Sequence, residues 1–185
     1  MKIHPKSNSQ AGQESFVLEM THNKKNGVYV EIGAYHASID SNTYILETEF
    51  NWTGISLELD VKRCSEFNIK RRNICINDNA IKFNYNKKFK EINFPRTFDY
   101  LQLDIEPAVN TFRALLKFPL REYQPFIITF EHDKYANKFN WSIQFLAFLY
   151  LSIHGYKRIK KNVTPLAKGQ EKNSFEDWYV KNRIS

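Results

Sequence analysis

Apolar residues along this chain form short runs that alternate with stretches of helical spacing. Residues 28–32 are a run of mostly β-branched and aromatic side chains, too short for a helix and typical of a buried strand. Apolar side chains at helical spacing follow over residues 44–50, and a second short run over residues 55–57 leads into Glu58. The pattern over residues 27–60 therefore predicts a strand–helix–strand unit.

The same alternation continues toward the end of the chain. Further strands are predicted at residues 72–77, 98–103, 126–130, 156–162 and 177–180. Further helices are predicted from about residue 13 and over residues 61–67, 107–116 and 139–153. Residues 81–85 are interpreted as a small extra strand, and residues 87–96 as a charged loop. Strands that alternate with helices predict an α/β fold with a mostly parallel sheet and helices on both faces.

Length and composition predict a single domain over residues 1–185, in which residues 1–9 form a loose arm. A hydrophobic content of 42% is typical of a globular protein with a substantial core. No apolar run reaches about 18 residues, so we expect no membrane span and no membrane partner, and we expect residues 139–153 to pack in the core. With no apolar leader and two cysteines, a cytoplasmic location is expected.

The net charge of +7 permits an anionic partner such as nucleic acid. Lysine is scattered along the chain, however, and the basic run at residues 70–72 is interpreted as a solvated edge. A nucleic-acid partner is therefore the less favoured alternative to a small-molecule or glycan acceptor. The cysteine spacing fits no zinc motif, and no spacing of acidic residues and histidine demands a metal.

Polar side chains follow five of the predicted strands. They are Glu31 with Gly33, Glu58 with Asp60, Asp78 with Asn79, Asp104 with Glu106, and Glu131 with His132. Ligands of open parallel sheets bind outside the carboxyl ends of the strands, so these residues predict one ligand site. The competing interpretation is that loops are polar anyway.

Six segments, taken in order, resemble the FkbM family of S-adenosylmethionine-dependent methyltransferases. They are SQAGQE at residues 9–14, EIGA at 31–34, SNTYILE at 41–47, WTGI at 52–55, LDIE at 103–106 and FEHD at 130–133. The resemblance covers about residues 9–160. It implies a Rossmann-like class I methyltransferase fold with seven strands in the order 3-2-1-4-5-7-6, in which only the seventh strand is antiparallel.

The resemblance also implies S-adenosylmethionine as cofactor, with Glu58 on the ribose hydroxyls and Asp104 beside the methyl group. The implied cofactor-binding residues are Glu31, Gly33, Ala34, Tyr35, Glu58, Leu59, Asp78, Asn79 and Asp104. The chain departs from the family in the donor loop, where Asn-Asp-Gly is replaced by Tyr35, His36 and Ala37, and at Pro107, where a glycine is usual.

The leading hypothesis is O-methylation of a small-molecule or sugar hydroxyl. His132 is expected to be the general base, because neutral histidine is available near pH 7, and Asp104 or Glu131 is the alternative. A structural, hydrogen-bonded His132 is the competing interpretation. Two other functions remain open: a nucleic-acid or cap methyltransferase, and a non-catalytic binding protein that retains the fold.

Overall fold

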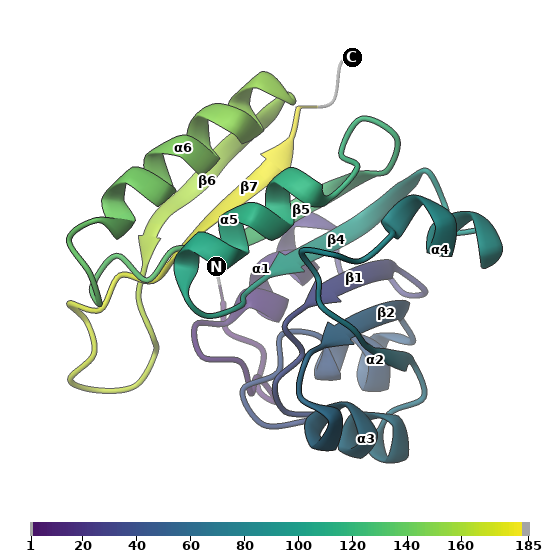
Figure 1. Ribbon diagram of the computed structural model, residues 1–185. Helices are drawn as coiled ribbons and strands as arrows, with labels where there is room; N and C mark the ends of the chain where they lie inside the picture. The colour runs from purple at the N-terminus through teal and green to yellow at the C-terminus, as the bar shows by residue number, and fades with distance from the viewer. Residues whose placement is uncertain (1, 183–185) are drawn as a thin grey trace.

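A seven-stranded sheet with helices on both faces forms the centre of the computed structural model, which describes residues 2–182 (Figure 1). The strands are β1 (Val28–Ile32), β2 (Thr53–Glu58), β3 (Ile74–Asn77), β4 (Thr97–Leu103), β5 (Gln124–Glu131), β6 (Tyr156–Val163) and β7 (Glu176–Lys181). Their order across the sheet is β3-β2-β1-β4-β5-β7-β6. Among these strands only β7 runs antiparallel to its neighbours, so the predicted order and directions are confirmed.

The pairing register aligns the ends of the central strands. Ile32 at the end of β1 is opposite Leu57 of β2 and Leu103 of β4. Because these strands are parallel, the residues that follow them leave the sheet at the same edge. Gly33, Glu58 and Asp104 are therefore neighbours in space although they are far apart in sequence.

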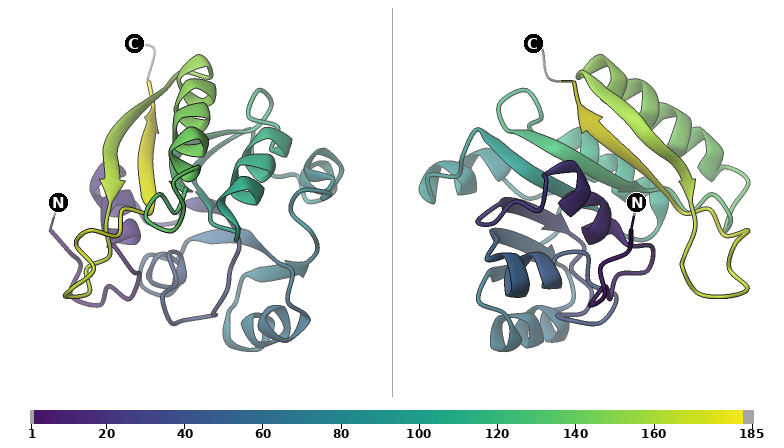
Figure 2. Two further views of the ribbon diagram at one scale, coloured as in Figure 1. Left: turned by 60° about the vertical axis from the view of Figure 1, so that its left-hand side comes forward. Right: turned by 180° about the vertical axis from the view of Figure 1, so that it is seen from behind.

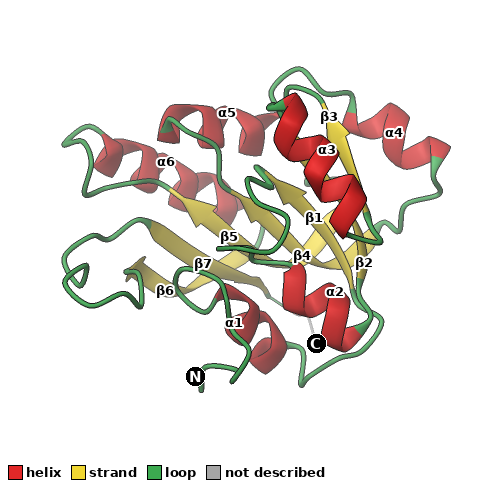
Figure 3. Ribbon diagram, turned by 90° about the horizontal axis from the view of Figure 1, so that it is seen from below, coloured by secondary structure: helices red, strands yellow, loops and turns green. Residues whose placement is uncertain are grey.

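Within the described residues, six helices pack on the two faces of this sheet. They are α1 (Gln13–Met20), α2 (Tyr44–Phe50), α3 (Val61–Lys70), α4 (Tyr85–Glu91), α5 (Ala108–Lys117) and α6 (Asn140–Ile153). Figures 2 and 3 show α5 and α6 on one side of the sheet and α1 and α2 on the other. Buried side chains of α4, α5 and α6 share one hydrophobic core with β1, β4 and β5, while α1 and α2 share a second one.

The predicted extra strand at residues 81–85 is wrong, and the predicted charged loop at 87–96 is wrong over residues 87–91, which belong to α4, and confirmed over residues 92–96. A turn at residues 80–82 precedes α4, and the Asn84 side chain accepts a 3.1 Å hydrogen bond from the Lys87 amide at the first turn of the helix. Tyr85 and Phe89, four residues apart, bury their rings in the core. The surrounding lysines hide this short apolar spacing in the sequence.

Arg71, interpreted from the sequence as part of a solvated basic edge, is buried. Its Nε donates a 2.8 Å hydrogen bond to Glu47 Oε2, and its Nη1 donates a 2.8 Å hydrogen bond to the carbonyl of Ala37. The guanidinium thus connects the end of α3 to α2 and to the loop after β1. Buried arginines require such paired acceptors, and the local sequence does not reveal them.

The first residues, expected to form a loose arm, contact α1 and the loop after β1. The His4 amide donates a 2.9 Å hydrogen bond to Ser15 Oγ, and the Asn8 side chain donates to the carbonyl of Ser38. Ser9 donates to Glu14 within α1. These contacts hold Gln10 beside the cavity described below.

Helix α6 packs in the core on one face only, whereas the sequence predicted core packing for this apolar segment as a whole. Ala147 and Leu151 are buried, but Trp141 and Phe145 are largely exposed. No helix within residues 2–182 combines the length and the apolar character needed to cross a bilayer.

Candidate functional site

A cavity of about 600 Å³ lies at the carboxyl ends of β1, β2, β4 and β5, a size typical of small-molecule sites. Every cofactor-binding residue expected from the sequence lines it: Glu31, Gly33, Ala34, Tyr35, Glu58, Leu59, Asp78, Asn79 and Asp104. A second hollow of about 480 Å³ lies at the opposite end of the strands, near Val28 and Asp99. Fewer carboxylates line this hollow, so the candidate catalytic and cofactor-binding side chains are gathered at the first cavity.

The loop after β1 turns at Gly33, which has a positive φ of 87°. The amides of Gly33 and Ala34 both donate to the carbonyl of Leu57, at 3.0 and 3.2 Å. A β-carbon at Gly33 would overlap the carbonyl of Asp104. Glycine is thus needed here for both its backbone conformation and the close approach of the loop to the end of β4.

Glu58 at the end of β2 organises the loops on either side of it. Its Oε2 accepts a 2.8 Å hydrogen bond from the Tyr35 amide, and its Oε1 accepts one of 2.8 Å from the Asp60 amide. A carboxylate has about four acceptor positions, so further acceptor capacity remains for ligand hydroxyls. An acidic residue at this point binds a ribose in nucleotide-binding folds.

Glu31 of β1 is held rigidly in the floor of the cavity. Thr43 Oγ1 donates to its Oε1 at 2.9 Å, and Ser56 Oγ donates to its Oε2 at 2.6 Å. Burial raises the pKa of this carboxyl, and Arg71 opposes the shift. Both oxygens are therefore oriented by protein donors before any ligand binds.

Two buried amide side chains present unpaired oxygens at this cavity. Gln102 Oε1 and Asn42 Oδ1 have no hydrogen-bond partner in the described part of the chain, and both residues line the cavity. A buried acceptor without a donor is unfavourable, so these oxygens fit a ligand that carries N–H or O–H groups. Sequence reasoning missed both, although Gln102 is two residues before Asp104, the spacing at which side chains of an extended segment point to the same side.

Asp104 follows β4 and has a strongly shifted pKa. Burial and the neighbouring charges of Asp133 and Glu106 raise the pKa of this carboxyl to about 7. Within residues 2–182, no lysine or arginine forms an ion pair with Asp104. Its carboxyl can therefore accept or release a proton near neutral pH.

Glu131 and His132, the two candidate general bases at the end of β5, point to opposite sides because side chains alternate along an extended chain. Glu131 lines the cavity with Asp104, whereas His132 is fully buried and is not part of the lining. His132 Nε2 lies 3.3 Å from Asp177 Oδ1, and its Nδ1 accepts a 3.2 Å hydrogen bond from the Lys134 amide. The structure thus brings Asp104 and Glu131 together, and His132 faces β7 instead.

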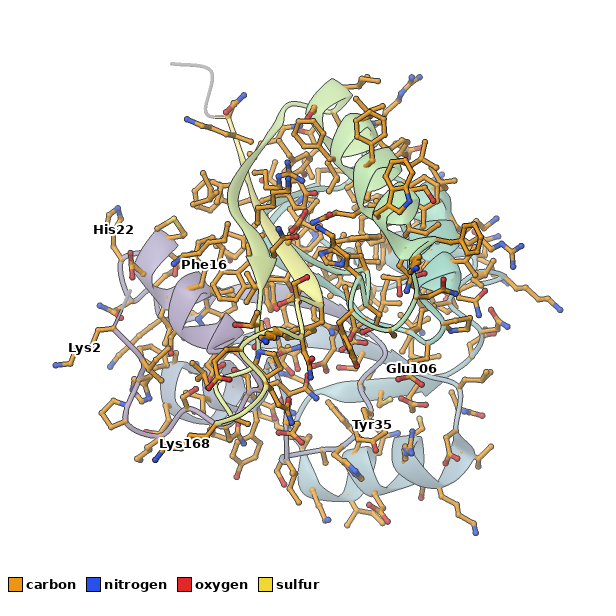
Figure 4. All side chains as sticks on the ribbon, turned by 90° about the vertical axis from the view of Figure 1, so that its left-hand side faces the viewer. Lys2, Phe16, His22, Tyr35, Glu106 and Lys168 are labelled. Atoms are coloured by element: carbon orange, nitrogen blue, oxygen red, sulfur yellow. The ribbon has the colours of Figure 1, made fainter. Side chains whose placement is uncertain are left out.

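An aromatic–cation pair borders the cavity. The guanidinium of Arg63 lies 4.0 Å above the ring of Tyr35, and both residues line the cavity. Figure 4 shows Tyr35 and Glu106, from the loops after β1 and β4, at the same end of the sheet. Arg63 was not predicted, because it is one of several basic residues on α3 without a distinguishing pattern.

The acidic residues do not form a metal-ligand set. In the part of the chain that the structure describes, no group of three or more histidine, cysteine, aspartate or glutamate side chains could hold a metal ion.

Comparison with protein-family models finds no match, and no curated protein sequence matches the chain. Solved structures do match. The O-methyltransferase from Bacillus cereus, in complex with SAH, has a TM-score of 0.60 at 14% identity, covering 97% of this chain and 83% of that protein. The N-methyltransferase NodS from Bradyrhizobium japonicum has a TM-score of 0.56 at 9% identity, covering 91% and 94%.

A TehB-like SAM-dependent methyltransferase from Corynebacterium glutamicum is also similar, with a TM-score of 0.54 at 9% identity over 92% of this chain and 88% of that protein. The neighbours include both O- and N-methyltransferases, so the likeness does not select an acceptor atom. The mostly parallel seven-stranded sheet, with helices on both faces, is thus the Rossmann-like fold of class I methyltransferases.

Proposed function

We propose that the protein is an S-adenosylmethionine-dependent methyltransferase whose acceptor is a hydroxyl group of a small molecule or sugar. One observation carries the proposal: Glu31, Glu58 and Asp104, from the ends of three neighbouring parallel strands, converge on one cavity. The methyltransferase-like fold supports it. The six ordered segments that resemble the FkbM family support a position near that family, and two free, buried cysteines suit a reducing cytoplasm.

The cavity fits the cofactor in its chemistry. The unpaired oxygens of Gln102 and Asn42 suit the ammonium and hydroxyl donors that the cofactor carries, and Glu58 has acceptor capacity for ribose hydroxyls. Gly33 lets the loop after β1 approach the end of β4, where a β-carbon would overlap the carbonyl of Asp104. When bound, S-adenosylmethionine supplies an electrophilic methyl group on a cationic sulfonium, whose charge the carboxylates Glu31 and Asp104 favour.

Asp104 is the general base that the geometry supports best. Its carboxyl lines the cavity and has a pKa raised to about 7 by burial and by Asp133 and Glu106, so it is half ionised near neutral pH. Loss of its negative charge on taking a proton from the acceptor hydroxyl relieves this repulsion. Glu131 lies at the same end of the sheet as a second carboxylate, and His132 supports the end of β5 through Asp177.

A nucleic-acid acceptor receives less support. Glu106 lines the cavity with Asp104, and the negative charges of Glu106 and Asp133 both raise the pKa of Asp104. Their negative charges would oppose the phosphate backbone that an RNA or DNA acceptor brings to this end of the cavity. Among the residues that line the cavity, acidic side chains outnumber the one basic side chain, Arg63, so the net charge of +7 does not extend to the lining.

Isothermal titration calorimetry with S-adenosylmethionine and with S-adenosylhomocysteine tests the proposal directly. We expect one binding site for each ligand and a rise in the melting temperature on binding. A screen with methyl-labelled donor and hydroxyl-bearing acceptors then tests transfer. Failure to bind either ligand would overturn the proposal in favour of a non-catalytic binding protein, and transfer to RNA alone would support a nucleic-acid methyltransferase.

A further inference from the structure

The outward face of α6 is a continuous apolar stripe. Trp141, Phe145 and Leu149 are spaced four residues apart and are 60, 50 and 40% exposed. Leu146 and Ile153 extend the same face and are also exposed. Soluble proteins rarely leave such a set of large apolar side chains in water, and a contiguous patch of this kind marks an interaction surface.

Helix α5 lies beside α6 and continues this surface. The two helices pack against each other on the same face of the sheet, as Figures 1 and 2 show. Val109 and Leu116 are exposed on α5. We call the exposed residues of both helices the α5–α6 face; they are Val109, Arg113, Leu116, Lys117, Trp141, Phe145, Leu146, Leu149, Ser152 and Ile153.

Every charge on this face is positive. Neither helix contains an aspartate or glutamate, and α5 presents Arg113 and Lys117 among its exposed residues. Lys138 is exposed just before α6. None of these three cations forms an ion pair with another described residue. Glu106, an acid that closely precedes α5, lines the cavity.

The positive charges of the α5–α6 face favour a lipid surface over a second copy of the chain as its partner. An interface between two identical copies related by a two-fold axis must complement itself, and this face would set cations against cations. An anionic bilayer complements it in both respects, because apolar side chains enter the headgroup boundary while lysine and arginine meet negative lipids. Exposed tryptophan is typical of that boundary.

We propose that the α5–α6 face docks the protein on the surface of an anionic lipid bilayer. Helix α6 has 14 residues, fewer than the roughly 20 needed to span the hydrocarbon core, so it lies along the surface. The expectation of no membrane span is compatible with this peripheral contact, whereas the expectation of no membrane partner is not. Docking does not depend on the proposed catalytic activity and is tested without cofactor.

Trp141 provides a direct probe of docking. The chain has three tryptophans, and Trp52 and Trp178 are buried, so a change in emission on binding lipid reports on Trp141. Vesicles of phosphatidylcholine with about one third phosphatidylglycerol should shift the emission to shorter wavelength and carry the full chain in flotation. Pure phosphatidylcholine vesicles should do neither, and added salt should weaken the binding.

Paired substitutions assign the binding to this face. We expect the double variant Phe145→Gln, Leu149→Gln to bind anionic vesicles on the order of tenfold more weakly, and the double variant Arg113→Gln, Lys117→Gln similarly. The matched control is Ile69→Gln on α3, where the side chain is 80% exposed away from this face. Circular dichroism and urea unfolding verify that each variant is folded.

Four results would overturn the proposal. The first is absence of flotation with anionic vesicles, and the second is equal binding to neutral and anionic vesicles. The third is unchanged binding of the Phe145→Gln, Leu149→Gln variant. The fourth is a lipid-free dimer in sedimentation equilibrium whose formation shifts the emission of Trp141, which would assign the face to a second copy.

Discussion

The backbone amide of Tyr35 donates a 2.8 Å hydrogen bond to the Oε2 atom of Glu58. This bond joins the loop after β1 to the end of β2, across two chain segments that are 23 residues apart. The same carboxylate also holds the Asp60 amide at the start of α3. Glu58 therefore shapes the loop that borders the cavity as well as lining it, a role that its position at a strand end does not reveal in the sequence.

Glu58→Ala should therefore abolish cofactor binding and also cost stability. Loss of two charge-assisted hydrogen bonds to backbone amides costs about 1.5–3 kcal/mol for each. Glu58→Gln retains one acceptor oxygen and separates the effects, because it should lower S-adenosylhomocysteine affinity at least tenfold with a smaller loss of stability. Calorimetry and urea unfolding measure the two quantities. Wild-type affinity in Glu58→Gln would contradict the ribose assignment.

Activity should follow the ionisation of Asp104. A general base acts in its ionised form, so kcat/KM should fall about tenfold per pH unit below the pKa of about 7 and level off above it. Asp104→Asn should lower kcat by roughly 10²–10⁴-fold and remove this pH dependence. A pH–rate profile with a labelled donor measures both. An Asp104→Asn variant that keeps the acidic limb would assign the base to another group.

His132→Gln should affect stability more than the pH dependence of turnover. Its ring is buried between Asp177 and the Lys134 amide, so its loss leaves a buried carboxylate with one partner fewer, at a cost of about 1–3 kcal/mol. The fall in kcat/KM below about pH 7 should remain in this variant, because it reflects protonation of Asp104. If that fall disappears and stability is unchanged, the sequence-based expectation of His132 as base is restored.

Gly33→Ala should weaken cofactor binding and destabilise the fold. The substitution forces a β-carbon onto the carbonyl of Asp104 and places alanine at a φ of 87°. Gly169→Ala is the matched control, because Gly169 has a similar φ of 84° and no atom within 4 Å of the added carbon. Gly169→Ala should cost about 1 kcal/mol from backbone strain. An equal effect of the two substitutions would show that close packing at Gly33 is unimportant.

Glu176→Gln should flatten the pH dependence of stability. Burial raises the pKa of this carboxyl to about 8, so the unfolded chain releases the proton at lower pH than the folded one. The free energy of unfolding of the wild type should therefore fall as pH rises between about 5 and 8, by on the order of 3 kcal/mol from this group. Urea unfolding at both pH values measures the difference. If the free energy of unfolding changed with pH by the same amount in wild type and variant, the raised pKa of Glu176 would be contradicted.

Much of this fold follows from local pattern. The short runs of β-branched, aromatic and leucine side chains at β1, β4 and β5 and the helical spacing of α1 and α5 specify their own elements, because side-chain period decides which face of each element is apolar. Parallel strands joined by right-handed crossovers then bring polar strand ends to one edge. The positions of Gly33, Glu58 and Asp104 around one cavity are therefore consequences of the sequence pattern.

Other features depended on contacts between segments distant in sequence. Arg71 is buried because Glu47 and the Ala37 carbonyl happen to surround it, and a basic run gives no sign of that. His132 faces Asp177 rather than the cavity because β7 inserts antiparallel beside β5. The sequence determined which residues leave the strands at the ligand edge, whereas only the tertiary structure decided which of them face the cavity. Neighbouring strands and helices fix burial, partners and pKa, and those neighbours are set by long-range packing rather than by local spacing.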